Sequence, residues 1–209
     1  MSSWGALKTK VKQGVPLKYH TSFRLGGPAE YFIRPETLDE LISLLGLAKK
    51  YGIPFRLIGC GSNILAADRG VKAAVIKLSG SYFTGIAFKG TTVYAGSAAT
   101  LKNIILQAAR RGLSGMEFLA GIPGTLGGAL AMNAGIPGKD ISHILESVTV
   151  MGSSGRIKDL PRKQIKFAYR SSGLSRYIIL SACLNLKKSG PKEIRRRIDP
   201  SLCSYTCWD

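Results

Sequence analysis

The residues best suited to chemistry lie in a glycine-rich run inside an uncharged stretch. Residues 118–138 contain no Lys, Arg, Asp or Glu, although the 209-residue chain has a formal net charge of +18. Within this stretch, residues 121–128 read Gly-Ile-Pro-Gly-Thr-Leu-Gly-Gly. Successive backbone N–H groups at a helix N-terminus can bind an anion without any basic side chain. The run therefore predicts either a site for a cofactor pyrophosphate or a buried segment in which glycine permits close helix packing.

A second glycine turn follows the predicted strand at residues 55–58. Residues 59–63 read Gly-Cys-Gly-Ser-Asn. The turn is not a P-loop, because no Gly-Lys-Ser/Thr follows, and it lacks the third glycine of the dinucleotide fingerprint. Alone it is typical of a plain turn. Paired with the run at 121–128, it could hold a diphosphate from a second side.

Three other places carry polar groups of interest. Tyr169-Arg170-Ser171-Ser172 places a phenol, a guanidinium and two hydroxyls together, and arginine can clamp a carboxylate or phosphate bidentately. A surface loop is the alternative interpretation there. His20 is typical of a turn or surface residue rather than a catalyst, and Glu117 could pair with a nearby cation.

The elements that must position these residues follow from periodicity and caps. Thr37 and Glu40 form a predicted capping box for a helix with apolar residues at 38, 41, 42, 45 and 48. Thr100 caps a second predicted helix with apolar residues at 101, 104, 105 and 108, ending at Gly112. Further strands are predicted at 71–78, 91–95 and 177–186, and a hairpin at 145–160 turns at 152–155.

Strands outnumber helices and do not alternate with them regularly, so the fold class is α+β rather than a doubly wound sheet. We expect two closely packed subdomains at 1–70 and 71–190, with a ligand between them, followed by a truncated helix and an unrelated tail at 191–209.

The composition limits the kinds of molecule that the chain could bind. The chain has 30 basic and 12 acidic residues, which allows a nucleic acid, an anionic lipid or a small anionic substrate. The basic residues are scattered and no aromatic residues interleave them, so we predict no nucleic-acid partner. The spacing of Cys60, Cys183, Cys203 and Cys207, with only two histidines, predicts no metal site. Prolines and glycines in 118–138 argue against a membrane span, and the N-terminus lacks a signal-peptide core, which predicts a cytoplasmic protein.

Four segments together resemble one family. They are residues 20–29, 59–65, 115–135 and 167–172. In type and order they are similar to UDP-N-acetylenolpyruvoylglucosamine reductases, flavoenzymes of bacterial peptidoglycan precursor synthesis. The resemblance implies an FAD-binding fold of the vanillyl-alcohol-oxidase type, with FAD between two α+β subdomains.

The resemblance also implies which residues approach FAD. They are Gly59, Cys60, Gly61, Ser62, Asn63, Gly121, Ile122, Pro123, Gly124, Thr125, Gly127, Gly128, Asn133 and Gly135.

In the family, NADPH reduces FAD, and hydride then passes to the enolpyruvyl group of a UDP-sugar to give UDP-N-acetylmuramate. Arg170 matches the catalytic arginine, which would stabilise negative charge on that group, and Tyr169 would contact the substrate. The oligomeric state is left open by the sequence.

The similarity stops around Asp199, whereas family members continue into a third domain that carries a proton-donating serine and a glutamate. Ser204 is not assigned the proton-donor role, because the residues around it do not match. We therefore expect impaired turnover. Two alternatives stay open: a catalytically inactive FAD-binding module and a basic nucleic-acid-binding protein.

Overall fold

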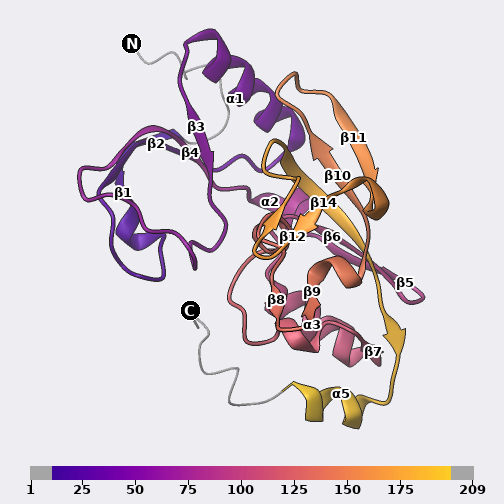
Figure 1. Ribbon diagram of the computed structural model, residues 1–209. Coiled ribbons are helices and arrows are strands. Elements are labelled where there is room, and N and C mark those ends of the chain that lie inside the picture. The colour runs from indigo at the N-terminus through magenta and orange to yellow at the C-terminus, as the bar shows by residue number, and fades with distance from the viewer. Residues whose placement is uncertain (1–10, 199–209) are drawn as a thin grey trace. The chain divides into compact units, whose positions relative to one another are not determined.

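A computed structural model describes residues 11–198 of the chain. The expectations for Cys203, Ser204, Cys207 and the tail at 199–209 therefore lie outside the described residues. The chain divides into two compact units, Met1–Phe83 and Thr84–Asp209 (Figure 1).

The first unit is built around a four-stranded sheet. Its elements are β1 (Val11–Pro16), the 3-10 helix η1 (Leu17–Tyr19), β2 (Pro28–Ile33), α1 (Leu38–Lys50), β3 (Phe55–Leu57), β4 (Val71–Ile76) and α2 (Gly80–Thr84). The strand order is β1-β2-β4-β3, with β1 antiparallel to β2 and the other pairs parallel. The boundary expected at residue 70 thus falls before β4 and α2, although β4 lies inside this sheet.

Burial explains why β4 is an inner strand. Residues Ala73, Ala74, Val75 and Ile76 are all buried, without alternation. A continuous apolar run is typical of a strand with parallel neighbours that is covered on both faces. Strand β4 therefore lies inside the sheet rather than at its edge.

Helix α1 begins at the predicted cap. The Glu40 N–H donates to Thr37 Oγ1 at 3.2 Å, while the Glu40 carboxylate accepts the N–H of Glu36 at 2.7 Å. The buried side chains of the helix are Leu41, Leu44 and Ala48. The predicted apolar face was shifted, because Ile42 is 41% exposed and Leu44 is fully buried.

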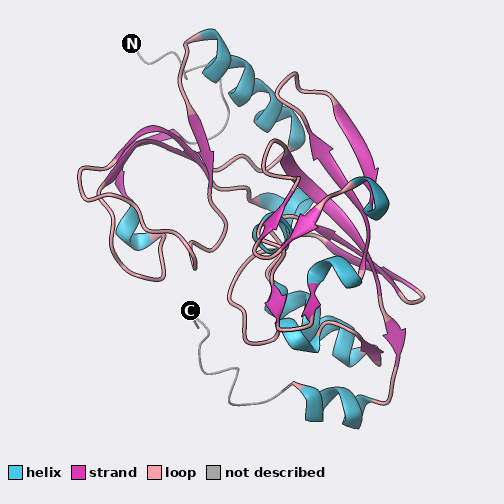
Figure 2. Ribbon diagram, in the orientation of Figure 1, coloured by secondary structure: helices cyan, strands magenta, loops and turns pink. Residues whose placement is uncertain are grey.

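The second unit contains a five-stranded antiparallel sheet in the order β11-β10-β14-β6-β5. Figure 2 draws the strands in magenta. These strands are β5 (Ile86–Lys89), β6 (Thr92–Gly96), β10 (Leu145–Met151), β11 (Ile157–Pro161) and β14 (Ile178–Asn185). The predicted hairpin is confirmed, since β10 and β11 pair around residues 152–155.

The helices and minor strands of this unit carry the segments of interest. They are α3 (Leu101–Arg110), β7 (Leu113–Ser114), η2 (Glu117–Leu119), α4 (Leu126–Ala131), β8 (Gly135–Ile136), β9 (Lys139–Asp140), η3 (Ile141–His143), η4 (Arg162–Gln164), β12 (Phe167–Ala168), β13 (Ser171–Ser172), β15 (Lys187–Lys188) and α5 (Pro191–Arg197).

Helix α3 matches its prediction. Thr100 Oγ1 accepts the N–H of Asn103, and the buried side chains are those at 101, 104, 105 and 108. They join one core with Leu126 and Leu130 of α4 and with inward residues of the sheet such as Val148. Packing α3 and α4 into this core fixes the segment between them, which contains the glycine run. The predicted α+β class is confirmed. Within residues 11–198, no helix has the length and apolar character that crossing a membrane requires.

Candidate functional site

The glycine run of the second unit is held at both ends by backbone hydrogen bonds. The N–H of Ile122 donates to the Leu119 carbonyl at 3.0 Å, so the run starts as a continuation of η2. The N–H of Leu101 donates to the Gly124 carbonyl at 3.0 Å, which ties the run to the start of α3. The loop is therefore a fixed surface rather than a free linker.

The first-turn N–H groups of α4 all donate to acceptors within the protein. The N–H of Leu126 donates to the Ala99 carbonyl at 2.9 Å, and that of Gly127 to the Ser97 carbonyl at 2.8 Å. The N–H of Gly128 donates to Thr125 Oγ1 at 3.3 Å. The N–H groups of Leu126, Gly127 and Gly128 thus all have partners within the protein, so in this structure they are not free donors.

Gly127 instead follows the packing interpretation. A Cβ at this position would lie 3.0 Å from the Ser97 Cβ and 3.1 Å from its carbonyl oxygen. Few real Cβ contacts are that short, so a side chain would push α4 away from the turn after β6. Glycine permits the close approach that the hydrogen bond to Ser97 requires.

Three backbone N–H groups of the loop at 121–125 have no hydrogen-bond acceptor among the described residues. They are the N–H groups of Gly121, Gly124 and Thr125. The antiparallel bridge between Thr100 and Thr125 is made by their neighbours' amides, a pattern that turns the Thr125 N–H away from Thr100. Anion binding from this run therefore rests on the loop before the helix, not on the helix.

The segment after α4 meets the Tyr169-Arg170 hairpin. Asn133 has a positive φ of 45°, and its Nδ2 donates to Asp140 Oδ2 at 3.0 Å and to the Ala168 carbonyl at 3.1 Å. Arg170 Nη1 donates to the Gly135 carbonyl at 3.0 Å. The structure thus brings Asn133 and Gly135 to the hairpin that carries Arg170, which lies 35 residues after Gly135 in the sequence.

The hairpin tip presents its side chains outward. Tyr169 is 90% exposed, and the guanidinium carbon of Arg170 lies 5.5 Å from the centre of the Tyr169 ring. Arg170 has a φ of 54°, and Ser172 Oγ anchors the base of the hairpin by donating to the Ala131 carbonyl at 3.0 Å. An anchored base with an exposed cationic tip suits contact with an anionic ligand.

Gly135 is required for chain packing. A Cβ there would overlap the Lys139 carbonyl oxygen and lie 2.5 Å from the Asp140 Cα. Gly135 and Asp140 are partners in the β8–β9 pair. Its glycine identity therefore does not need a cofactor to explain it.

Sequence reasoning missed the residues that orient Asn133. The Asp140 carboxylate accepts from Asn133, from the N–H and Oγ of Ser142, and lies 3.0 Å from His143 Nδ1. Burial alone would raise the pKa of Asp140, but hydrogen bonds from Ser142, Asn133 and His143 outweigh burial and lower that pKa. The Asp-Ile-Ser-His sequence at 140–143 is a cap signal that could have indicated the turn, though not its contact with Asn133.

Two buried polar atoms beside α4 lack a partner. Among the described residues, Ser97 Oγ and Asn133 Oδ1 are the buried side-chain oxygens or nitrogens with no hydrogen bond. Ser97 contacts Gly127 at the start of α4, and Asn133 follows its end. Buried polar groups are nearly always satisfied in native proteins. Both exceptions therefore flank the helix that follows the loop at 121–125.

The glycine turn of the first unit packs against the segment at 20–28. Gly61 has a φ of 71°, a Cβ there would overlap the His20 carbonyl oxygen, and its own carbonyl accepts the N–H of Ser22 at 3.1 Å. Gly27 donates to the Ala67 carbonyl at 3.0 Å. The segments at 20–29 and 59–65, two of the four on which the family resemblance depends, are thus in contact. Cys60 and Asn63 are exposed on this turn.

His20 follows its prediction as a turn residue. It caps η1 and stacks on Phe32, with ring centres 4.2 Å apart. Burial and the nearby charges of Lys77, Arg34 and Lys12 lower its pKa. In the part of the chain that the structure describes, no group of three His, Cys, Asp or Glu side chains could hold a metal ion.

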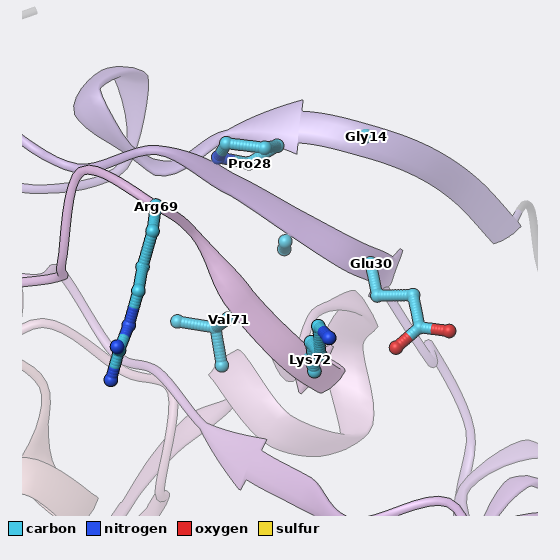
Figure 3. Close-up of a pocket in the computed structure, with 7 residues that line it drawn as sticks. Gly14, Pro28, Glu30, Arg69, Val71 and Lys72 are labelled. Carbon is cyan, nitrogen blue, oxygen red and sulfur yellow. The ribbon is translucent and has the colours of Figure 1, made fainter.

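A pocket of about 520 Å³ lies in the first unit on strands β1, β2 and β4 (Figure 3). Its lining includes Glu30, Arg69 and Lys72. No residue of either glycine run lines it, so it is separate from the predicted cofactor residues.

Comparison with known proteins identifies the fold. Residues 29–161 match the family model described as an FAD binding domain. The UDP-N-acetylenolpyruvoylglucosamine reductase of Clostridioides difficile is 42% identical over 194 residues, which cover 92% of this chain and 64% of that protein. The chain thus spans somewhat less than two thirds of that relative's length.

Solved structures agree with this match. The chain superposes on the UDP-N-acetylenolpyruvylglucosamine reductase of Thermus caldophilus with a TM-score of 0.79 and 34% identity, covering 91% of this chain and 67% of that one. Cholesterol oxidase from Brevibacterium sterolicum, at 15% identity and a TM-score of 0.65 over 87% of this chain and 38% of its own, shares the fold alone. The flavoprotein fold that the resemblance implied is confirmed. The chain therefore belongs to the UDP-N-acetylenolpyruvoylglucosamine reductase family, and residues 29–161 match its FAD-binding domain.

Proposed function

We propose that this chain binds FAD and that the loop at 121–125 holds the cofactor's pyrophosphate. The observation that carries this proposal is the set of three unpartnered amides, on Gly121, Gly124 and Thr125, in a loop fixed at both ends. Amide donors that are already in place pay no reorganisation cost when an anion arrives, so they stabilise it effectively.

The residues present fit this cofactor. The loop has no carboxylate to repel a diphosphate, since residues 118–138 hold no charged side chain. The two unpartnered buried oxygens, Ser97 Oγ and Asn133 Oδ1, lie on either side of α4, as expected where a polar ligand completes the hydrogen bonding. We further propose that Asn133 and Gly135, and the turn at 59–63 in the first unit, contribute contacts to FAD.

We also propose that the chain takes part in the reaction of its family, the NADPH-dependent reduction of UDP-N-acetylglucosamine enolpyruvate. Bound FAD supplies the hydride-transfer chemistry. The Arg170 guanidinium, held by the Gly135 carbonyl, stabilises negative charge on the enolpyruvyl group through its outward N–H groups. Tyr169, exposed beside it, contacts the UDP-sugar.

The first experiment measures FAD affinity of the purified chain by flavin fluorescence. Gly124→Asp should abolish binding, because a carboxylate would stand where the phosphates accept hydrogen bonds. Gly46→Asp is the matched control: it adds the same charge on α1, where a Cβ meets nothing within 4 Å. A folded Gly124→Asp variant that binds FAD as tightly as Gly46→Asp would contradict the placement.

A second experiment separates the reductase from an inactive FAD-binding module. NADPH oxidation that depends on the UDP-sugar supports the proposed reaction. Bound flavin without such oxidation supports the module instead. A colourless chain that binds DNA with a steep salt dependence would contradict both and favour the nucleic-acid alternative.

A further inference from the structure

A buried carboxylate stands just before the glycine loop. Glu117 is 7% exposed, and it accepts hydrogen bonds from Ser114 Oγ at 2.6 Å and from the N–H of Gly115 at 2.7 Å. Gly115 has a φ of 131°, a conformation that few other residues adopt. The Glu117 side chain thus fixes the turn that leads from β7 into η2.

Short-range hydrogen bonds connect this turn to the loop. The N–H of Leu119 donates to the Met116 carbonyl at 2.9 Å, and that of Ala120 to the Glu117 carbonyl at 3.0 Å. The next bond runs from Ile122 to Leu119, inside the glycine run. Because these bonds overlap, a shift of the Glu117 turn moves Gly121 and the residues after it.

Helix α5 is attached to the same carboxylate. Arg197 Nη1 donates to Ser114 Oγ at 3.1 Å and lies 4.0 Å from Glu117 Oε1. Ile194 of α5 is 1% exposed, and the helix packs against α3, β7 and η2 (Figure 1). One arginine therefore links the end of the described chain to the start of the loop.

Charge favours this link. Burial alone would raise the pKa of Glu117, but hydrogen bonds from Ser114 and Gly115 and the charge of Arg197 outweigh burial and lower that pKa. The carboxylate is therefore ionised at neutral pH. A buried ionised group needs its partners in place, so losing Arg197 weakens the whole turn.

We propose that Glu117 and Arg197 are positioning residues that couple α5 to the glycine loop and thereby set its affinity for FAD. Neither residue belongs to the loop itself. The inference rests on the proposed function, because it takes the loop at 121–125 as the pyrophosphate site.

The test compares two neighbouring arginines of α5 in the full 209-residue chain. Arg197→Ala removes the contacts to Ser114, Glu117 and Glu193. Arg196→Ala removes only an ion pair with Glu193, so it controls for the loss of that contact. We expect Arg197→Ala to weaken FAD binding by roughly tenfold, a typical coupling between linked sites, and Arg196→Ala by less than about twofold.

Two further measurements distinguish positioning from a general loss of stability. Hydrogen exchange at the amides of Gly121, Gly124 and Thr125 should rise in Arg197→Ala without FAD and stay unchanged in Arg196→Ala. Arg197→Lys, which keeps a cation near Glu117, should recover much of the affinity. Equal FAD affinity of the wild type and Arg197→Ala overturns this inference alone. A wild type that does not bind FAD overturns the proposed function and this inference with it.

Discussion

Gly61 offers the sharpest test of how the first unit is built. Its φ of 71° lies in the left-handed region, which costs a non-glycine residue roughly 1–2 kcal/mol. A Cβ on Gly61 would also overlap the His20 carbonyl oxygen and lie 3.0 Å from the Thr21 Cα. These atoms are backbone and cannot rotate aside, so the overlap adds about 1–3 kcal/mol.

The matched control is Gly52, which follows α1 in the same unit. Its φ is 64°, but a Cβ there meets nothing within 4 Å. Gly52→Ala therefore loses only the conformational term. The free energy of unfolding of Gly61→Ala should be lower than that of Gly52→Ala by about 2 kcal/mol. Urea unfolding followed by circular dichroism measures the difference. Equal stabilities would refute the close packing of the turn at 59–63 against the segment at 20–22.

Thr125→Ala should lower the free energy of unfolding by about 1 kcal/mol and Thr125→Ser should not, because Thr125 Oγ1 caps α4 through Gly128; thermal melts measure both. Burial and the Glu146 carboxylate raise the pKa of Cys183 to about 11, so iodoacetamide at neutral pH should alkylate it far more slowly than exposed Cys60, and peptide mass spectrometry would contradict this by finding equal rates. Because folding lowers the pKa of Glu117, the ionised carboxylate stabilises the folded protein at pH values above its unfolded-state pKa. This stabilisation is lost as the pH falls through the lower folded-state pKa. Below pH 4.5, the free energy of unfolding should therefore fall more steeply with decreasing pH in the wild type than in Glu117→Gln. An equal pH dependence in the two proteins would contradict the assignment.

Local signals predicted helices α1 and α3, strands β4, β6 and β14, and the β10–β11 hairpin. The caps Thr37 and Thr100 and the apolar positions of α3 are all read correctly from neighbouring residues. The face of α1 was shifted, because Ile42 and Leu44 are both apolar and only tertiary packing decides which is buried. Periodicity gives a helix, but it does not choose between adjacent apolar stripes.

The candidate site depended on contacts that a sequence does not display. The first-turn amides of α4 were expected to face a ligand. Those of Leu126 and Gly127 instead donate to the carbonyls of Ala99 and Ser97, which lie in the turn before α3. Arg170 reaches the Gly135 carbonyl in the same way. Long-range pairing of this kind uses backbone atoms, so no residue type announces it in advance.

The most direct test is a crystal structure of the chain with FAD bound. We expect pyrophosphate oxygens to lie within about 3 Å of the amide nitrogens of Gly121, Gly124 or Thr125, the distance of an N–H···O hydrogen bond. The N–H groups of Leu126 and Gly127 should keep their hydrogen bonds to the carbonyls of Ala99 and Ser97. Phosphates bound elsewhere, or bound by the first-turn amides of α4, would contradict the proposed placement.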